Sequence, residues 1–256
     1  MINKLITRRS AFIGIAGAGG GLMLAGCDRI MQIPGALSAL ESAEFLSLHG
    51  QRILMRQDRT LAQEYPRSEI SKNFKANGTT RPQSAEYAQL AMNGFADYRL
   101  KIDGLVARPL ELSLEQIRGL ASRTQITRHD CVEGWSAIGE WTGVPLSTLL
   151  QMAGLGNGTQ YIVFHCADDL LGQGLYYESI DLVDAYHPQT IMAYAMNGQT
   201  LPIPYGAPLR LRVERQLGYK MAKYVMRIEA VASFANIGRG RGGFWEDLGY
   251  EWYAGI

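Results

Sequence analysis

The chain alternates apolar and polar residues in several short runs, and this alternation predicts its strands. Residues 98–103 follow a two-residue period, typical of a half-buried strand, and the same period recurs in residues 209–214, where one face is cationic. Residues 161–166 form a compact β-type run, and residues 224–231 are predicted as the last strand. Asn197-Gly198 predicts a hairpin turn.

Helix signals lie between these strands. Ser113 and Gln116 form a capping box for a short helix, and Pro145 predicts the start of a second helix. Residues 36–65 are rich in Leu, Ala, Glu, Gln and Arg, which predicts a helical arm, broken near residues 49–50. Because strands and helices mix without a regular strand–helix–strand rhythm, we predict an α+β fold.

Composition and charge narrow the class of protein only slightly. The chain has 256 residues, of which 47% are hydrophobic and 19% are charged, which suits one domain or one domain with an arm. The formal net charge of +1 gives no overall attraction to nucleic acid, so none is expected as a partner. Three cysteines are too few for a disulfide scaffold, so each is interpreted by itself.

The first 27 residues have the pattern of an export signal. An arginine pair in residues 7–9 precedes an apolar, Gly-rich run, residues 11–26, that is too short to predict a spanning helix. The pair resembles a twin-arginine signal, and Leu24-Ala25-Gly26-Cys27 resembles a lipoprotein processing box. We expect a periplasmic product anchored to the membrane by a lipid on Cys27; ordinary cleavage, with Cys27 lost or left free, is the alternative.

The segment of residues 128–136 holds the main candidate for chemistry. Cys131 follows Arg128 and His129, whose positive charge would stabilise its thiolate, the form that binds metal. Thiolate is also a soft ligand, suited to a metal such as molybdenum. These residues alone fit a core cysteine, or a disulfide between Cys131 and Cys166, equally well.

The surrounding sequence favours the metal. Cys131-Val132-Glu133-Gly134-Trp135-Ser136, followed by Gly143-Val144-Pro145-Leu146, closely resembles the molybdenum-binding segment of the sulfite oxidase superfamily. Within it, the nearest branch is the one that contains the periplasmic methionine sulfoxide reductase catalytic subunit. The resemblance implies that Cys131 is the protein ligand to molybdenum and the catalytic residue. It covers the chain from about Ser71 to the C-terminus.

A second pair of segments resembles the family's pterin-phosphate site. These are residues 206–210, Gly-Ala-Pro-Leu-Arg, and residues 218–223, Gly-Tyr-Lys-Met-Ala-Lys. The cofactor's pterin tail ends in a phosphate, so its site needs Arg or Lys and free backbone N–H groups. The resemblance implies contacts from Arg210 on a strand and, after it, from Lys220, Met221, Ala222 and Lys223. A solvated basic strand face is the alternative.

Five further positions are carried over from the resemblance. Asn73, Lys75 and Asn77 lie in an irregular arm that touches the pterin in relatives, although a plain turn is the alternative. Cys166 stands where the reductase branch has a small polar residue in contact with the cofactor, and a buried strand cysteine is the alternative. Tyr205 stands where close relatives carry Asn or His, so it departs from the pattern.

The resemblance implies a molybdenum enzyme with a single molybdopterin. We predict an export signal in residues 1–27, a tether and helical arm in residues 28–70, and one sulfite-oxidase-type domain with mixed sheets in residues 71–256. Oxygen-atom transfer is expected, as reduction of a small or protein-borne S-oxide or N-oxide. A separate haem partner, a membrane cytochrome, would supply the electrons to a monomeric catalytic subunit, because too little chain follows Lys223 for a dimerisation domain.

Three other functions remain open from the residues. The first is a sulfite-oxidising enzyme on the same cofactor. The second is a thiol enzyme in which His129 activates Cys131 as a nucleophile. The third is a lipoprotein binding module that uses the fold without metal. Metal analysis separates the molybdenum enzyme from the thiol enzyme and the binding module.

Overall fold

The computed structural model describes residues 46, 48–50, 52, 60–170 and 172–256. The chain divides into two compact units, Met1–Gln51 and Arg52–Ile256, and the fold below is that of the second unit. The twin-arginine pair, Cys27, the tether and most of the predicted arm lie outside the described residues. Within the described part of the chain, no helix has both the length and the apolar character needed to cross a membrane.

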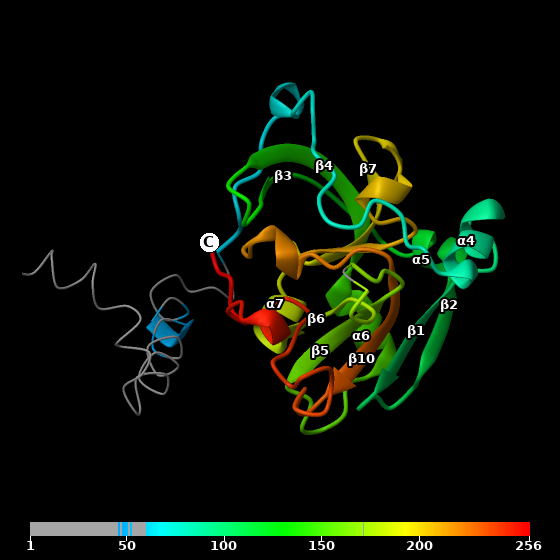
Figure 1. The fold of residues 1–256 in the computed structure, drawn as a ribbon, viewed down its shortest axis with the longest axis vertical. Helices are drawn as coiled ribbons and strands as arrows, with labels where there is room; N and C mark the ends of the chain where they lie inside the picture. The colour runs from blue at the N-terminus through cyan, green and yellow to red at the C-terminus, as the bar shows by residue number, and fades with distance from the viewer. Residues whose placement is uncertain (1–45, 47, 51, 53–59, 171) are drawn as a thin grey trace, which may run out of the picture. The chain divides into compact units, whose positions relative to one another are not determined.

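One five-stranded sheet forms the lower part of the unit in Figure 1. Its strands, in spatial order, are β2 (Leu110–Ser113), β1 (Arg99–Gly104), β10 (Val225–Val231), β5 (Tyr161–Cys166) and β6 (Tyr177–Asp181). β1 pairs with β10 in parallel, and the other neighbours are antiparallel. β5 lies inside the sheet with β10 and β6 on its two edges, and four of its six residues are buried, which explains its nearly continuous apolar sequence.

A second sheet carries the candidate metal segment. Its strands run in the order β3 (Arg123–Asp130), β4 (Ser136–Pro145), β7 (Ile191–Met196) and β8 (Gln199–Thr200), and β9 (Arg210–Arg212) pairs with β7. The Asn197-Gly198 turn joins β7 to β8, and both residues have positive φ (51° and 75°), as a tight hairpin requires. The hairpin prediction is therefore confirmed.

The helices are short, and most of them lie between strands. They are α4 (Ala85–Met92), α5 (Leu114–Arg118), α6 (Leu146–Ala153) and α7 (Leu182–Ala185), with 3-10 turns η1 (Arg67–Glu69), η2 (Ile203–Tyr205), η3 (Gly218–Lys220) and η4 (Glu246–Leu248). The capping box is present in both halves: the Ser113 hydroxyl accepts from the Gln116 N–H, and the Gln116 side chain accepts from the Ser113 N–H. Pro145 is the N-cap of α6 and not its first residue.

The predicted arm does not remain helical to residue 65. Residues 60–65 are not helical, and the Tyr65 N–H donates to the Ile126 carbonyl beside an isolated bridge between Glu64 and Thr127. The composition of this segment favours helix, but β3 offers backbone partners here, and pairing with them satisfies the N–H and C=O groups of both segments. The two sheets and the intervening helices nonetheless form the expected mixed α and β domain.

Candidate active site

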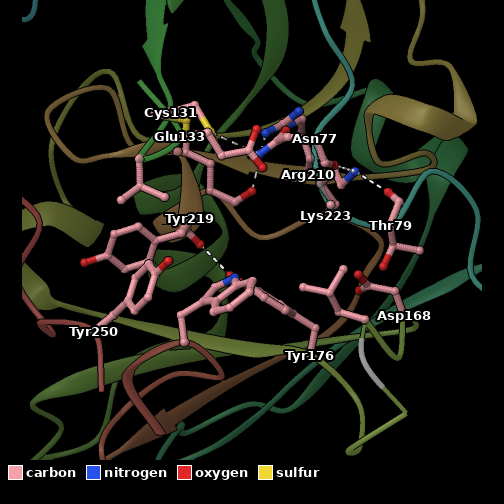
Figure 2. Close-up of a pocket in the computed structure, with 16 residues that line it drawn as sticks. Asn77, Thr79, Cys131, Glu133, Asp168, Tyr176, Arg210, Tyr219, Lys223 and Tyr250 are labelled. Carbon is pink, nitrogen blue, oxygen red and sulfur yellow. Dashed lines mark hydrogen bonds between the residues drawn. The ribbon is translucent and has the colours of Figure 1, made fainter. Parts of the chain in front are cut away.

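A cavity of about 130 Å³ opens between loops of both sheets (Figure 2). Six stretches of chain line it, although they are far apart in sequence. They are the arm at residues 77–79, the turn at residues 131–133, a stretch with Asp168, Leu170 and Tyr176, Arg210, a stretch with Gly218, Tyr219, Met221 and Lys223, and a C-terminal stretch with Trp245 and Tyr250. The structure thereby brings together the thiol, the basic segment and part of the arm that the sequence singled out.

Cys131 lies in a tight turn directly after β3. The Gly134 N–H donates to the Cys131 carbonyl, and the Cys131 N–H donates to the Trp135 carbonyl, each at 2.9 Å. Gly134 has φ of 83°, a conformation that favours glycine. Hydrogen bonds between backbone atoms hold the turn together, and the thiol faces the cavity. Cys131 is 7% exposed, and its sulfur lies 4.0 Å from the amide nitrogen of Asn77.

The prediction that Arg128 and His129 stabilise the Cys131 thiolate is wrong. Burial raises the pKa of the Cys131 thiol, and the nearby Glu133 carboxylate adds to this effect. Arg128 instead binds Asp130 at 2.9 Å, and burial together with the Arg212 charge lowers the pKa of His129 well below its usual value, so the imidazole is neutral. A metal cation would itself supply the missing positive charge, since a coordinating thiol loses its proton.

Two alternatives to a metal ligand are also wrong. Cys131 and Cys166 are both free thiols, so the disulfide is not formed. His129 is not placed as a base for Cys131: its Nδ1 lies 3.0 Å from an Arg212 nitrogen and 3.3 Å from the sulfur of Met221. Within the described residues, no hydrogen bond joins the imidazole to the thiol. The activated-nucleophile hypothesis therefore loses its general base.

Arg210 and Lys223 are two buried cations at the cavity. Arg210 is 2% exposed, donates to the carbonyls of Tyr205 (3.0 Å) and Met221 (3.4 Å), and lies over the Trp141 ring at 4.9 Å. Its Nε is buried and has no hydrogen-bond partner in the described part of the chain. Burial, reinforced by Arg212, lowers the pKa of Arg210 to about 9. The hypothesis of a solvated basic strand face is therefore wrong.

Lys223 reaches the same cavity from the following turn. It is 9% exposed, and its ammonium group donates to the carbonyls of Asn77 (2.6 Å), Thr79 and Pro204 (3.1 Å). Burial and the charge of Arg210 lower the pKa of Lys223 to about 7. Within the described residues neither cation has a salt bridge, so a bound anion would stabilise both.

Gly206 allows the two cations to approach each other. Its φ is 112°, and a Cβ at this position would lie 2.9 Å from the Cβ of Lys223 and 3.1 Å from the Cβ of Arg210. A side chain here would force these two residues apart. The local sequence Gly206-Ala207-Pro208-Leu209-Arg210 is thus adapted to bring the cations together.

The other predicted positions divide between the cavity and its surroundings. Asn77 and Met221 line the cavity, whereas Ala222 is buried behind it. Asn73 is exposed, and Lys75 binds the Glu133 carboxylate at 3.0 Å on the surface.

Three further predicted residues do not line the cavity. Tyr205 donates its hydroxyl hydrogen to the Phe74 carbonyl at 2.6 Å. Cys166 is 2% exposed and lines a separate cavity that also includes His165. Lys220 is fully buried in contact with two carboxylates. The structure thus places these three side chains around the cavity without exposing them to it.

Sequence reasoning missed several residues of the cavity. Asp168 is 4% exposed, one of its carboxylate oxygens has no partner in the described part of the chain, and burial raises its pKa to about 6. Its position just after a predicted strand was a usable signal. Tyr176, Tyr219, Trp245 and Tyr250 together form what we call the aromatic wall of the cavity. Its labelled tyrosines lie on the side away from Cys131 in Figure 2.

Contacts between rings hold the aromatic wall together. Trp245 and Tyr250 are stacked with ring centroids 5.2 Å apart, and Tyr250 meets Tyr219 edge-on at 5.3 Å. The Tyr176 hydroxyl donates to the Tyr219 carbonyl at 2.6 Å. The wall therefore presents a large and internally braced apolar surface to the cavity.

These features define a class of site. The described residues hold no cluster of three or more His, Cys, Asp or Glu side chains able to bind a metal. A bound organic group that brings its own soft ligands would complete the coordination of a metal at Cys131. The unpartnered Nε of Arg210 and the two unpaired cations fit a phosphate on that group. A metal cofactor with an anionic tail is the ligand that fits the thiol and the cations together.

Comparison with known proteins identifies the class more closely. The family model of the oxidoreductase molybdopterin binding domain matches residues 87–236, more than half of the chain, and the chain belongs to this family. It is thus a molybdopterin-binding oxidoreductase. The matched range contains Cys131, Arg210 and Lys223, whereas Trp245 and Tyr250 lie beyond it.

Three curated relatives are named as subunits of a protein-methionine-sulfoxide reductase. A protein of Azospira oryzae named as a protein-methionine-sulfoxide reductase subunit, YedZ1, is 40% identical over 195 residues, which cover 76% of this chain and 68% of that protein. The protein-methionine-sulfoxide reductase catalytic subunits MsrP of Xanthomonas axonopodis and Gluconobacter oxydans are 34% and 37% identical, over 62% and 51% of this chain. The chain spans 52% and 46% of these two, about half of their length.

A solved structure also resembles the chain. The sulfane dehydrogenase SoxCD from Paracoccus pantotrophus superposes with a TM-score of 0.49 at 26% identity, over 54% of this chain and 39% of that chain.

Proposed function

We propose that this oxidoreductase transfers an oxygen atom, and that its reaction is the reduction of an S-oxide, with protein-bound methionine sulfoxide as the preferred class of substrate. The observation that carries the proposal is the meeting of the Cys131 thiol with Arg210 and Lys223 in one cavity. The names of the relatives support the choice of substrate.

Each residue of the cavity has a role in this proposal. Cys131 is the protein ligand to molybdenum, Arg210 and Lys223 bind the terminal phosphate of the pterin, and Asn77 and Met221 contact the cofactor. The bound cofactor supplies the oxygen-atom chemistry, and the overall reaction consumes two electrons and two protons per sulfoxide and releases a thioether and water. The other carried-over residues, Asn73, Lys75, Tyr205 and Ala222, support these contacts from around the cavity, whereas Cys166 is a buried strand cysteine outside it.

The aromatic wall and the mouth of the cavity fit a sulfoxide on a peptide. Thioether sulfur packs favourably on aromatic rings, and the wall offers such rings opposite Cys131. Val132 and Tyr250 are 47% and 38% exposed, so the cavity reaches the surface. A side chain carried on an exposed segment of another protein could therefore enter it.

Paired assays on the molybdenum-loaded protein test this reaction. With a reduced dye as electron donor, we expect turnover of methionine sulfoxide, free or in an oxidised peptide, and slower turnover of trimethylamine oxide. With sulfite and an oxidised dye, we expect little or no turnover. Rapid sulfite oxidation without reduction of either oxide would reverse the proposed direction and favour the sulfite-oxidising enzyme.

We further propose that the protein is exported to the periplasm and anchored by a lipid on Cys27, with residues 1–27 as the signal, residues 28–70 as tether and arm, and residues 71–256 as the catalytic domain. The arginine pair and the Leu24–Cys27 pattern support this layout. A membrane cytochrome would then deliver electrons at the membrane surface to a monomeric catalytic subunit.

Variants of the signal test the location. Replacing Arg8 and Arg9 with lysine should leave the protein in the cytoplasm, and Cys27→Ser should release an exported form from the membrane. Because stable anchoring needs more than one acyl chain, mass spectrometry should show a large lipid increment on Cys27. A membrane fraction unchanged by Cys27→Ser would contradict the anchor, and export unaffected by the lysine pair would contradict the twin-arginine route.

A further inference from the structure

Lys220 occupies a place that its sequence context did not indicate. It lies in the segment that resembles the pterin-phosphate site, but its side chain is fully buried and does not line the cavity. Its ammonium group donates to a carboxylate oxygen of Glu178 and to one of Glu246, both at 2.5 Å. These three residues, which we call the buried triad, are each at most 1% exposed.

The buried triad joins three segments that carry the aromatic wall. Lys220 is in η3, next to Tyr219. Glu246 begins η4, directly after Trp245. Glu178 is in β6, two residues after the wall residue Tyr176. Each member of the triad therefore lies within two residues of a ring that lines the cavity.

The charges of the buried triad require the lysine. Burial alone would lower the pKa of Lys220, but the two carboxylates outweigh burial and raise it, so the ammonium group stays charged. Burial and the charge of Glu246 raise the pKa of Glu178 well above its usual value, and Lys220 opposes this effect. Without the cation the two buried acidic groups would lose their counter-charge, which is strongly unfavourable. Gly243 packs directly against both carboxylates: a Cβ at this position would lie 2.0 Å from a Glu246 oxygen and 2.8 Å from a Glu178 oxygen.

We propose that Lys220 is a positioning residue for the substrate side of the cavity: by binding Glu178 and Glu246 it holds the aromatic wall in place opposite Cys131. Lys220 acts through the rings of Tyr219 and Trp245 and touches neither cofactor nor substrate. The proposal rests on the contacts of the triad, and only its kinetic test uses the proposed reduction of sulfoxides.

Four variants of the holoenzyme test this role. Lys220→Met leaves two carboxylates without a partner. Lys220→Met combined with Glu178→Gln and Glu246→Gln replaces the triad with neutral groups of similar size. Glu246→Leu releases η4 but keeps the balanced pair of Lys220 and Glu178, so it should fold even if Lys220→Met does not. Lys101→Met, at an exposed lysine of β1, is the control.

The readouts are molybdenum per chain, the near-ultraviolet circular dichroism of the stacked rings, and the kinetics of sulfoxide reduction. We expect Lys220→Met and Glu246→Leu to keep molybdenum, to lose part of the aromatic signal, and to raise KM by about tenfold with a much smaller change in kcat. The neutral triple variant should recover the aromatic signal and most of KM, and the control should behave as the wild type.

Two results would overturn the proposal. If Lys220→Met and the neutral triple variant lose molybdenum and pterin alike, Lys220 binds the cofactor directly. If Glu246→Leu folds with an unchanged aromatic signal and an unchanged KM, the triad does not position the wall. The circular dichroism and the molybdenum content do not depend on the substrate, so a wrong substrate assignment would leave them interpretable.

Discussion

Cys131→Ser is expected to abolish oxide reduction and to lower or disturb the bound molybdenum while the fold remains intact. A hydroxyl is a harder and poorer ligand than a thiolate for this metal. The turn itself should survive, because its two 2.9 Å hydrogen bonds, with Gly134 and Trp135, are made by the backbone and not by the thiol. Activity, molybdenum content and far-ultraviolet circular dichroism measure the three parts of this expectation.

Cys166→Ser is the matched thiol control for this experiment. Cys166 is also buried, at 2% exposed against 7% for Cys131, but its side chain lies outside the lining of the cavity, so the variant should keep its molybdenum. A Cys131→Ser protein that remains active with its normal metal content would remove Cys131 as the ligand. Equal loss of metal in both variants would instead indicate damage to the fold around β5.

Removal of either cation should weaken retention of the cofactor. A charge-assisted hydrogen bond contributes about 1.5–3 kcal/mol, so Arg210→Ala and Lys223→Ala should each weaken cofactor affinity by roughly 10- to 150-fold. Lys223→Ala should have the wider effect, because its ammonium group also holds the carbonyls of Asn77 and Thr79 in the arm. The measurement is pterin and molybdenum per chain after extended dialysis.

Arg227→Ala provides the control for charge removal. Arg227 pairs with Asp103 and Glu229 on the strands of the other sheet and does not line the cavity, so its loss should leave cofactor content unchanged. Full cofactor content in both the Arg210 and Lys223 variants would show that these cations do not bind the phosphate.

Hydrophobic periodicity predicted the strands whose buried face is apolar. It succeeded for β1, where Leu100 and Ile102 are fully buried between exposed polar neighbours. It gave no strand for β3, because the buried positions there are the polar residues Gln125, Thr127 and His129. These side chains are accommodated in a polar interior: Gln125, for example, donates to the Glu214 carboxylate at 2.7 Å.

A residue of the site was predictable where its neighbours in the sequence form a recognisable pattern. Cys131 and the pair of Arg210 and Lys223 lie in short segments with recognisable patterns. Trp245 and Tyr250 reach the cavity only through the fold, and no local pattern indicates them. The sequence around Lys220 suggests a phosphate ligand, and only the fold reveals its partners, which are 42 and 26 residues away in the chain.

Long-range packing also decides whether a basic strand is solvated. The alternation in residues 209–214 is the same for an exposed cationic face and for a buried one. In the structure Arg212 is fully buried, lies 4.4 Å from the centroid of the Trp141 ring, and pairs with Glu214. The buried Trp141 ring thus packs against both Arg210, which lines the cavity, and Arg212, which also pairs with Glu214. The sequence alone does not identify these contacts.

The most direct test of the account is the molybdenum and pterin content of the purified chain, produced in a host that makes the cofactor. We expect about one molybdenum and one pterin per folded chain, because one thiol and one phosphate-binding pair of cations share a single cavity. We also expect this content to fall in the Cys131→Ser variant. A folded chain that reduces sulfoxides without molybdenum, or that binds it equally well without Cys131, would contradict the account.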